Sequence, residues 1–214
     1  VWKLILDPID GTRLIMHDKR SAWSLAALAP QRGPQTCLTD LVVGAMTELP
    51  TTKGWRADQV SGWRHPDGSH SLVTKGIDVF SGVHYPLRQR PSRATTFAHG
   101  FAGLTKFFVE GRVAVAEVED ALWRKLGLSG GGESPRVFDD QYLSTGGQIH
   151  ELLCGHDLMN GDLRPYALAL AGIPDSIACH PYDIGPGFLL ELAGGILCGL
   201  DGQPLRAPLD TTTP

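Results

Sequence analysis

The period of the hydrophobic residues changes near residue 90, and this change constrains the fold of the 214-residue chain more than any other feature of its sequence. Before that point, three short runs alternate apolar and polar residues or are apolar throughout: Trp2 to Leu6, Ser21 to Ala29, and Leu41 to Leu49. Such runs, separated by clusters of Pro, Gly and Asp, are typical of strands joined by turns. We therefore predict an antiparallel sheet, followed by a linker at the proline-flanked basic stretch 88–93.

Beyond the linker, apolar residues recur at helical spacing. The run Val109 to Leu126 predicts a helix that stops before Gly127, and a second helix is expected from Gly147 to Leu153. Pro165 suits the first turn of a third helix. The predicted fold class is therefore α+β, with an antiparallel-sheet half over residues 1–92, a mixed α/β half over residues 93–214, and an active site between the two.

The end of the second half predicts one further helix and one further strand. Ile184 to Leu192 is apolar with a helical period, and the Gly-Gly pair at 194–195 is a stop signal. Ile196 to Leu200, followed by Asp-Gly, predicts a strand and a turn.

Composition and charge narrow the class of protein. Hydrophobic residues make up 42% of the chain and charged residues 20%, which predicts a soluble globular protein, and no apolar run approaches the ~18 residues that cross a bilayer. A net charge of −4 gives no reason to expect nucleic acid or a membrane as a partner. The four cysteines form no C-x-x-C pair, which argues against a zinc knuckle and a disulfide framework.

The first residue is Val1, and the chain opens directly into a strand-like run without an initiator methionine, a charged leader or an apolar signal region. We therefore expect that the true start of the protein is missing. A cytoplasmic location is the default expectation.

The segment directly after the first predicted strand carries two carboxylates and two turn residues, in the order Asp7-Pro8-Ile9-Asp10-Gly11-Thr12. Pro8 fixes one backbone dihedral and Gly11 permits a sharp turn, so Asp7 and Asp10 are expected to leave the strand end close together. Clustered carboxylates repel each other unless a cation lies between them, and hard oxygen ligands suit Mg²⁺ better than Zn²⁺. If the next segment is helical, the amides of Gly11 and Thr12 can bind an anion.

The same segment is also compatible with an ordinary turn, because Asp-Pro and Asp-Gly pairs are common turn formers. A second element far along the chain favours the metal-binding interpretation over the ordinary turn. His180-Pro181-Tyr182-Asp183 leads into the last predicted helix, which ends in Ala-Gly-Gly at 193–195. Taken alone, Asp183 is best read as a helix N-cap.

Together, the two elements resemble the paired signatures of the inositol monophosphatase superfamily: Asp-Pro-hydrophobic-Asp-Gly-Thr after a strand, and aromatic-Asp opening a helix that ends in Ala-Gly-Gly. The resemblance spans nearly the whole chain. It implies a layered α/β sandwich of the sugar-phosphatase type, here lacking its N-terminal helices. It also implies Mg²⁺-dependent hydrolysis of a phosphate monoester of a small polyol, sugar or nucleotide by metal-activated water.

By this resemblance, Asp7, Asp10, the backbone carbonyl of Ile9 and Asp183 would bind Mg²⁺. Asp7, Asp10 and Thr12 would be the catalytic residues, with Thr12 contacting phosphate through its amide and orienting the water through its hydroxyl. The substrate would be a small phosphorylated metabolite, and the family's frequent homodimers make a homodimer an expectation by analogy.

The remaining substrate-binding residues implied by the resemblance are Gly11, Thr145, Gly146 and Asp162. Thr145-Gly146-Gly147 is similar to a small-residue helix start in the family, and Asp162 falls near an acidic residue that holds substrate hydroxyls. A solvated loop aspartate is an equally good interpretation of Asp162. The insert between Asp162 and Asp183 leaves open whether inositol phosphate is the substrate.

Besides the residues around Asp162 and the insert that follows, a second departure from the family pattern concerns the metal shell. The family uses an acidic pair on an upstream helix and an acidic partner for the threonine hydroxyl, and both would precede Val1. We expect the 214-residue chain alone to be poorly active, and restoring the missing helices to raise its activity.

Two other readings remain open. The segment Ile9-Asp10-Gly11-Thr12 also resembles the nucleophile loop of haloacid-dehalogenase-type phosphatases, but that mechanism needs an aspartate two positions before Asp10, where this chain has Pro8. The other alternative is a non-catalytic relative or an inactive fragment that keeps the fold for binding.

Overall fold

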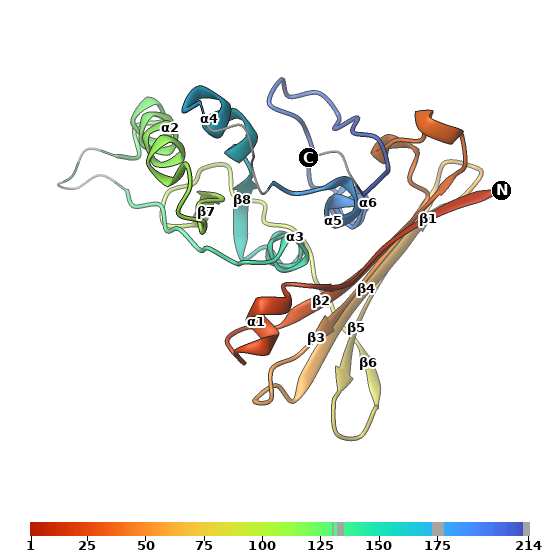
Figure 1. The fold of residues 1–214 in the computed structure, drawn as a ribbon. Helices are drawn as coiled ribbons and strands as arrows, with labels where there is room; N and C mark the ends of the chain where they lie inside the picture. Colours follow the sequence, from red (N-terminus) through yellow and green to blue (C-terminus); the bar gives the residue numbers. More distant parts are fainter. Residues whose placement is uncertain (130, 132–134, 173–177, 212–214) are drawn as a thin grey trace.

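The computed structural model describes residues 1–129, 131, 135–172 and 178–211, and it has a mixed α+β fold (Figure 1). Six antiparallel strands form one sheet in sequence order. They are β1 (Trp2–Asp10), β2 (Ala22–Pro30), β3 (Val43–Leu49), β4 (Arg56–Arg64), β5 (His70–Asp78) and β6 (His84–Pro86). The predicted antiparallel half is therefore confirmed.

The second half contains most of the helices and a small parallel sheet. Its strands are β7 (Phe101–Leu104) and β8 (Asp157–Gly161). The α-helices of the whole chain are α1 (Thr12–Met16), α2 (Arg112–Lys125), α3 (Thr145–Cys154), α4 (Arg164–Leu170), α5 (Pro181–Ile184) and α6 (Gly187–Leu192), and two 3₁₀ helices cover Gly33–Gln35 and Leu38–Asp40. The predicted helices at α2 and α3 are confirmed, and Pro165 lies in the first turn of α4.

Two predictions at the end of the chain are wrong. The expected single helix over Ile184 to Leu192 is divided into α5 and α6, because Pro186 lies between them and has no backbone N–H to continue the first helix. Ile196 to Leu200 is not a strand. Its side chains alternate between exposed and half-buried, and its one bridge joins Cys198 to Pro204.

One core lies between the six-stranded sheet and helices α3, α5 and α6, which pack on the same face of that sheet (Figure 1). Strand β2 supplies Trp23, Leu25 and Ala27 at every second position, as the period of a strand requires. Phe188 and Leu189 of α6 lie in the same core cluster as these β2 side chains. Each fully buried side chain of this size stabilises the fold by about 1.5–3 kcal/mol.

This core draws on residues of both sequence halves, so helices of the second half cover the sheet of the first. The boundary at residues 92 and 93 stays a prediction. On the opposite face of the sheet, Trp2, Leu4 and Leu6 of the edge strand β1 are each more than half exposed.

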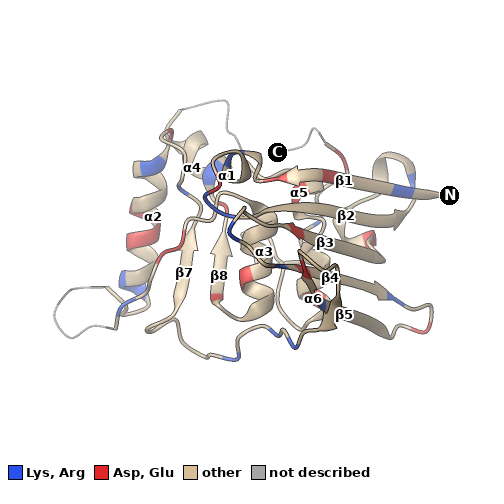
Figure 2. Ribbon diagram, turned by 90° about the horizontal axis from the view of Figure 1, so that it is seen from below, with Lys and Arg blue, Asp and Glu red and all other residues tan. Residues whose placement is uncertain are grey.

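Acidic and basic residues are interspersed in the structure, and helix α2 carries both signs along its length (Figure 2). This distribution agrees with the small net charge of −4. Within the described ranges, no helix has the length and apolar character needed to cross a bilayer.

Candidate metal centre

A bulge in strand β1 places Asp7 and Asp10 on the same face of the sheet. Asp7 lies opposite Leu25 and Asp10 lies opposite Trp23, so β1 advances three residues while β2 advances two. In a regular strand, residues three apart point to opposite faces, and the extra residue corrects this. Both aspartates therefore share the face that carries the core residues Leu25 and Trp23. Strand β1 also runs on to Asp10, past the Asp-Pro pair at which we expected it to end.

Helix α5 brings the third carboxylate to the same place. One carboxylate oxygen from each of Asp7, Asp10 and Asp183 lies within 4.8 Å of the others. Asp183 is at the third position of α5, where Oδ2 accepts a hydrogen bond from the amide of His180 at 3.1 Å. It is thus a capping-box residue at the N3 position, not the N-cap itself. Residues from the first strand and from one of the last helices converge, as the resemblance implied.

The N-terminus of helix α3 binds the side chain of Asp10. The amide of Gly146 donates to Oδ2 at 2.5 Å, and the hydroxyl of Ser144 donates to the same oxygen at 2.8 Å. The close approach requires a glycine, because a Cβ on Gly146 would lie 2.7 Å from Cβ of Trp23. The positive end of the α3 dipole therefore faces a carboxylate.

The surroundings of Asp10 and Asp183 disfavour the charged forms of both carboxylates. Burial, together with the nearby charge of Asp7, raises the pKa of Asp10 to about 6, although its hydrogen bonds to Gly146 and Ser144 oppose the rise. Burial and the charges of Asp10 and Asp7 raise the pKa of Asp183 to about 7. Both shifts have the sign expected where like charges share a half-buried site.

These residues fit a divalent cation. Three oxygen donors converge, and all of them are carboxylates, which suit Mg²⁺. Acidic clusters also occur without a bound ion, so the identification of Mg²⁺ belongs to the proposal below.

The rest of the first motif lies beside the cluster. The hydroxyl of Thr12 donates to the carbonyl of Ile9 at 2.8 Å, and the amide of Ile9 donates to Oδ1 of Asp7 at 3.0 Å. Gly11 has φ +85°, a conformation that glycine adopts without strain, and Thr12 begins α1 directly after it. The short helix α1 has five residues, so a phosphate site at the amides of Gly11 and Thr12 stays a prediction.

Two of the predicted substrate-binding residues have other contacts. The amide of Gly146 is bound to Asp10, and the hydroxyl of Thr145 lies 3.3 Å from Sγ of Cys179. Their contact with a substrate stays a prediction.

Asp162 is not a solvated loop residue, because it forms an ion pair with Arg164, in which Arg164 Nη2 lies 2.6 Å from Asp162 Oδ2. Its role in substrate binding stays a prediction, but the carboxylate is engaged in this structure.

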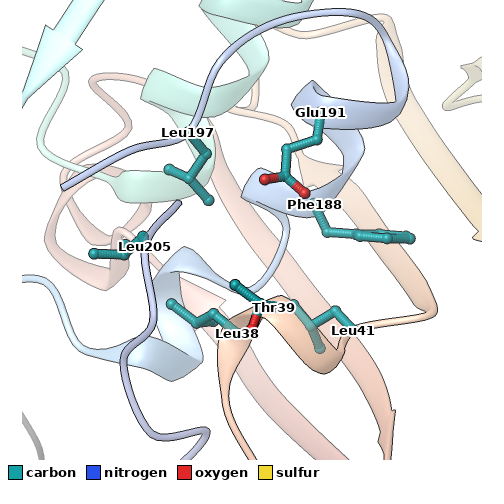
Figure 3. Close-up of a pocket in the computed structure, with 7 residues that line it drawn as sticks. All are labelled: Leu38, Thr39, Leu41, Phe188, Glu191, Leu197 and Leu205. Atoms are coloured by element: carbon teal, nitrogen blue, oxygen red, sulfur yellow. The ribbon is translucent and has the colours of Figure 1, made fainter. Parts of the chain in front are cut away.

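The hollow shown in Figure 3 lies apart from these residues. It is lined by leucines, Thr39, Phe188 and Glu191, none of which belongs to the predicted site. Its volume of about 10 Å³ holds at most one water molecule. An open apolar groove between α2 and α4 is larger, at about 460 Å³, and also contains none of the predicted residues. The metal-ligand geometry, rather than a cavity, identifies the candidate site.

Two residues of the site were missed from the sequence. Ser144 precedes a helical run and is a favoured N-cap residue type, so its place at the start of α3 could have been predicted, although its bond to Asp10 could not. Arg164 gave no signal, because an aspartate and an arginine two positions apart occur in many loops.

No protein-family model and no curated protein sequence matches this chain.

Proposed function

We propose that this protein is a Mg²⁺-dependent phosphate monoesterase of the inositol monophosphatase type. The observation that carries the proposal is the convergence of Asp7, Asp10 and Asp183, whose carboxylate oxygens lie within 4.8 Å of one another. The family resemblance implied this convergence, and carboxylates remote from each other would have excluded the proposal.

The chain's own residues have distinct parts in the proposed reaction. Asp7, Asp10 and Asp183 would hold the cation, with the carbonyl of Ile9 as a further ligand. A bound Mg²⁺ would supply Lewis-acid polarisation of the phosphoryl oxygens and an acidified water. Helix α3 holds Asp10 in place through Gly146 and Ser144, so this ligand needs little reorganisation when the cation binds.

Thr12 would orient the attacking water through its hydroxyl. This hydroxyl donates to the carbonyl of Ile9 at 2.8 Å, and Thr12 is the first residue of α1. We propose a small phosphorylated polyol, sugar or nucleotide as the substrate, because the family resemblance implies a phosphate monoester and a bound cation would neutralise the charge of its phosphoryl group.

A cytoplasmic location and homodimers remain part of the proposal. The four free cysteines support a reducing compartment, since unpaired thiols persist there.

The deciding experiment is a calorimetric titration of the chain with Mg²⁺. We expect saturable binding to the wild type and loss of binding in Asp183→Asn, which removes one charge and keeps the shape of the side chain. Asp67→Asn is the matched control, because Asp67 is an aspartate in an exposed turn between β4 and β5. Absence of Mg²⁺ binding to the wild type would contradict the proposal and favour a non-catalytic relative.

A panel of phosphate monoesters then tests the chemistry, and trapping with beryllium fluoride tests the mechanism; both use the chain joined to the family's upstream acidic helices, because the 214-residue chain alone is expected to be poorly active. Hydrolysis without an aspartyl adduct is the expected result, since the proposed mechanism has no covalent intermediate. An adduct on an aspartate would support the haloacid-dehalogenase mechanism instead.

A further inference from the structure

The ion pair of half-buried Asp162 and buried Arg164 occupies every acceptor position of the Asp162 carboxylate. Oδ1 accepts from Nε of Arg164 at 2.8 Å and from the Arg164 amide at 3.1 Å. Oδ2 accepts from Nη2 of Arg164 at 2.6 Å and from the amide of Cys179 at 3.1 Å. An ionised carboxylate has about four lone-pair positions, so these four contacts leave none for a substrate hydroxyl.

Holding this pair away from water has a cost. Arg164 is 4% exposed, and its Nη1 is buried with no hydrogen-bond partner among the described residues. Attraction within the pair outweighs burial, lowering the pKa of Asp162 and raising that of Arg164, but an unpaired buried donor is costly. The planar fork of Arg164, lying 5.0 and 5.2 Å from the rings of Phe107 and Phe108, instead fixes the direction of the Asp162 carboxylate.

The fixed carboxylate holds the backbone that carries Asp183. Asp162 binds the amide of Cys179, and the next amide along the chain, that of His180, binds Oδ2 of Asp183. Two consecutive amides therefore connect the buried pair to the third carboxylate of the cluster. A displacement of Cys179 would move the start of α5, on which Asp183 lies.

The same segment also contacts the helix that holds Asp10. Sγ of Cys179 lies 3.3 Å from the hydroxyl of Thr145, the first residue of α3. The residues on either side of Thr145, Ser144 and Gly146, both donate to Asp10. Cys179 thus lies between the supports of the two halves of the cluster.

We propose that Asp162 and Arg164 are positioning residues, which set the distance between Asp183 and the two aspartates of β1, and that Asp162 does not contact the substrate. This inference rests on the proposed metal centre. It assigns Asp162 a role other than the substrate contact that the family resemblance implied.

The test is a Mg²⁺ titration of Asp162→Asn beside the wild type, with thermal unfolding measured in parallel. The amide removes the charge and one pair of acceptor positions, so Cys179 loses part of its anchor. We expect Mg²⁺ affinity to fall by about 10–100-fold, the range found when groups that orient metal ligands are removed. Arg164→Lys keeps the charge and leaves the Asp162 bond to Cys179 possible, so it is expected to retain more affinity than Asp162→Asn.

Glu119→Gln is the matched control. Glu119 is also buried, pairs with a cation, Lys106 Nζ at 2.6 Å, and accepts from a backbone amide, that of Leu104 at 3.2 Å. It lies on α2 and is no part of the network that reaches Asp183. The control is expected to lower the thermal midpoint as Asp162→Asn does, while its Mg²⁺ affinity stays at the wild-type value.

The outcomes separate the two proposals. No Mg²⁺ binding to the folded wild type would overturn the metal centre and the positioning role with it. Binding to the wild type, with Asp162→Asn equal in affinity to Glu119→Gln, would overturn the positioning role alone. A raised KM for a polyol phosphate in Asp162→Asn at unchanged Mg²⁺ affinity would also overturn it, because that result indicates a substrate contact. If Asp162→Asn does not fold, Arg164→Lys decides: lower affinity than Glu119→Gln supports the role, and equal affinity overturns it.

Discussion

The backbone amide of Gly146 donates a hydrogen bond of 2.5 Å to Oδ2 of Asp10. This bond connects the first turn of α3 to the end of the first strand, two elements far apart in the sequence. It forms because a glycine at this position lets α3 approach β2 closely, and because the N-terminal amides of a helix have no partner within the helix. The position of one metal-ligand candidate therefore depends on the absence of a side chain elsewhere.

Gly146→Ala is expected to displace α3 from the sheet. The new methyl group would meet Trp23 and Leu25 at 2.7 and 2.8 Å, so the free energy of unfolding should fall by about 1–3 kcal/mol. The weakened bond to Asp10 should also reduce Mg²⁺ affinity. Urea denaturation and calorimetry measure the two effects. Gly199→Ala is the control, since its nearest neighbour is a flexible aspartate side chain, and equal losses in both variants would contradict the prediction.

Asp183→Asn is expected to stabilise the metal-free chain at pH 8 while it removes Mg²⁺ binding. The pKa of Asp183 rises from 3.8 to about 7 on folding, so this group contributes stability below pH 4 that is lost as the pH rises through about 7. Removing the charge should therefore raise the free energy of unfolding at pH 8 by about 1 kcal/mol, once solvent screening is allowed for. Thermal unfolding without metal, at pH 5 and pH 8, measures the difference.

The raised pKa values also predict how the stabilisation of the wild type by Mg²⁺ depends on pH. The cation competes with protons for Asp10 and Asp183, whose pKa values are about 6 and about 7. The rise in thermal midpoint on adding Mg²⁺ should be larger at pH 8 than at pH 5. A rise that is equal at both values would indicate that the cation binds elsewhere.

Asp58→Asn tests a buried pair beneath α3. Asp58 is 1% exposed, and its Oδ2 lies 3.3 Å from Nε2 of His150. Burial alone would raise the pKa of Asp58, but its interactions with His150 and Arg56 outweigh burial and lower the pKa. The stability that Asp58 contributes is therefore present above pH 4 and lost as the pH falls through the lowered value.

We expect Asp58→Asn to lower the free energy of unfolding by about 1–3 kcal/mol at pH 7, because it removes a buried charge that accepts hydrogen bonds from Arg56 and Gln89. The difference from the wild type should shrink below pH 4, and urea denaturation over a pH series measures it. Asp67→Asn, in an exposed turn, should cause a much smaller change. If the loss of unfolding free energy in Asp58→Asn does not change with pH, the charge of Asp58 is not the cause of that loss.

Thr12→Val is expected to reduce hydrolysis without changing Mg²⁺ affinity. Valine keeps the branched shape but loses the hydroxyl, which donates to Ile9 at 2.8 Å. Misplacing a reacting group by about 1 Å costs on the order of 10²-fold in rate, so losing the group that orients the water should have an effect of that size. Thr12→Ser retains the hydroxyl and should keep most of the activity. Equal losses of kcat in both variants would indicate a packing role.

The sequence was sufficient to predict the strands of the sheet and the clustering of Asp7 and Asp10, because both depend on local patterns. The period of two in β2 places Trp23, Leu25 and Ala27 on one face, and this pattern was visible directly. The chemistry of Asp7 and Asp10 was visible for the same reason. The bulge that turns both aspartates to one face could not be predicted, since it depends on the register with β2.

The contacts that complete the site depend on tertiary structure. The approach of Asp183 required the packing of α5 on β1, and only the comparison of two distant signatures predicted it. The division of α5 from α6 was missed because the apolar period outweighed the signal of Pro186. The pairing of Asp162 with Arg164 has no counterpart in composition or periodicity, and the structure alone shows it.

The first strand and one of the last helices both supply a ligand to the proposed metal centre. A cation bound there would act as a reversible cross-link between β1 and α5, and the loop that it closes would include most of the polypeptide. In the unfolded chain, bringing two points so far apart in sequence together has a large entropic cost, which grows only slowly with further length. Mg²⁺ would therefore be expected to slow global unfolding and to suppress fraying of the edge strand β1.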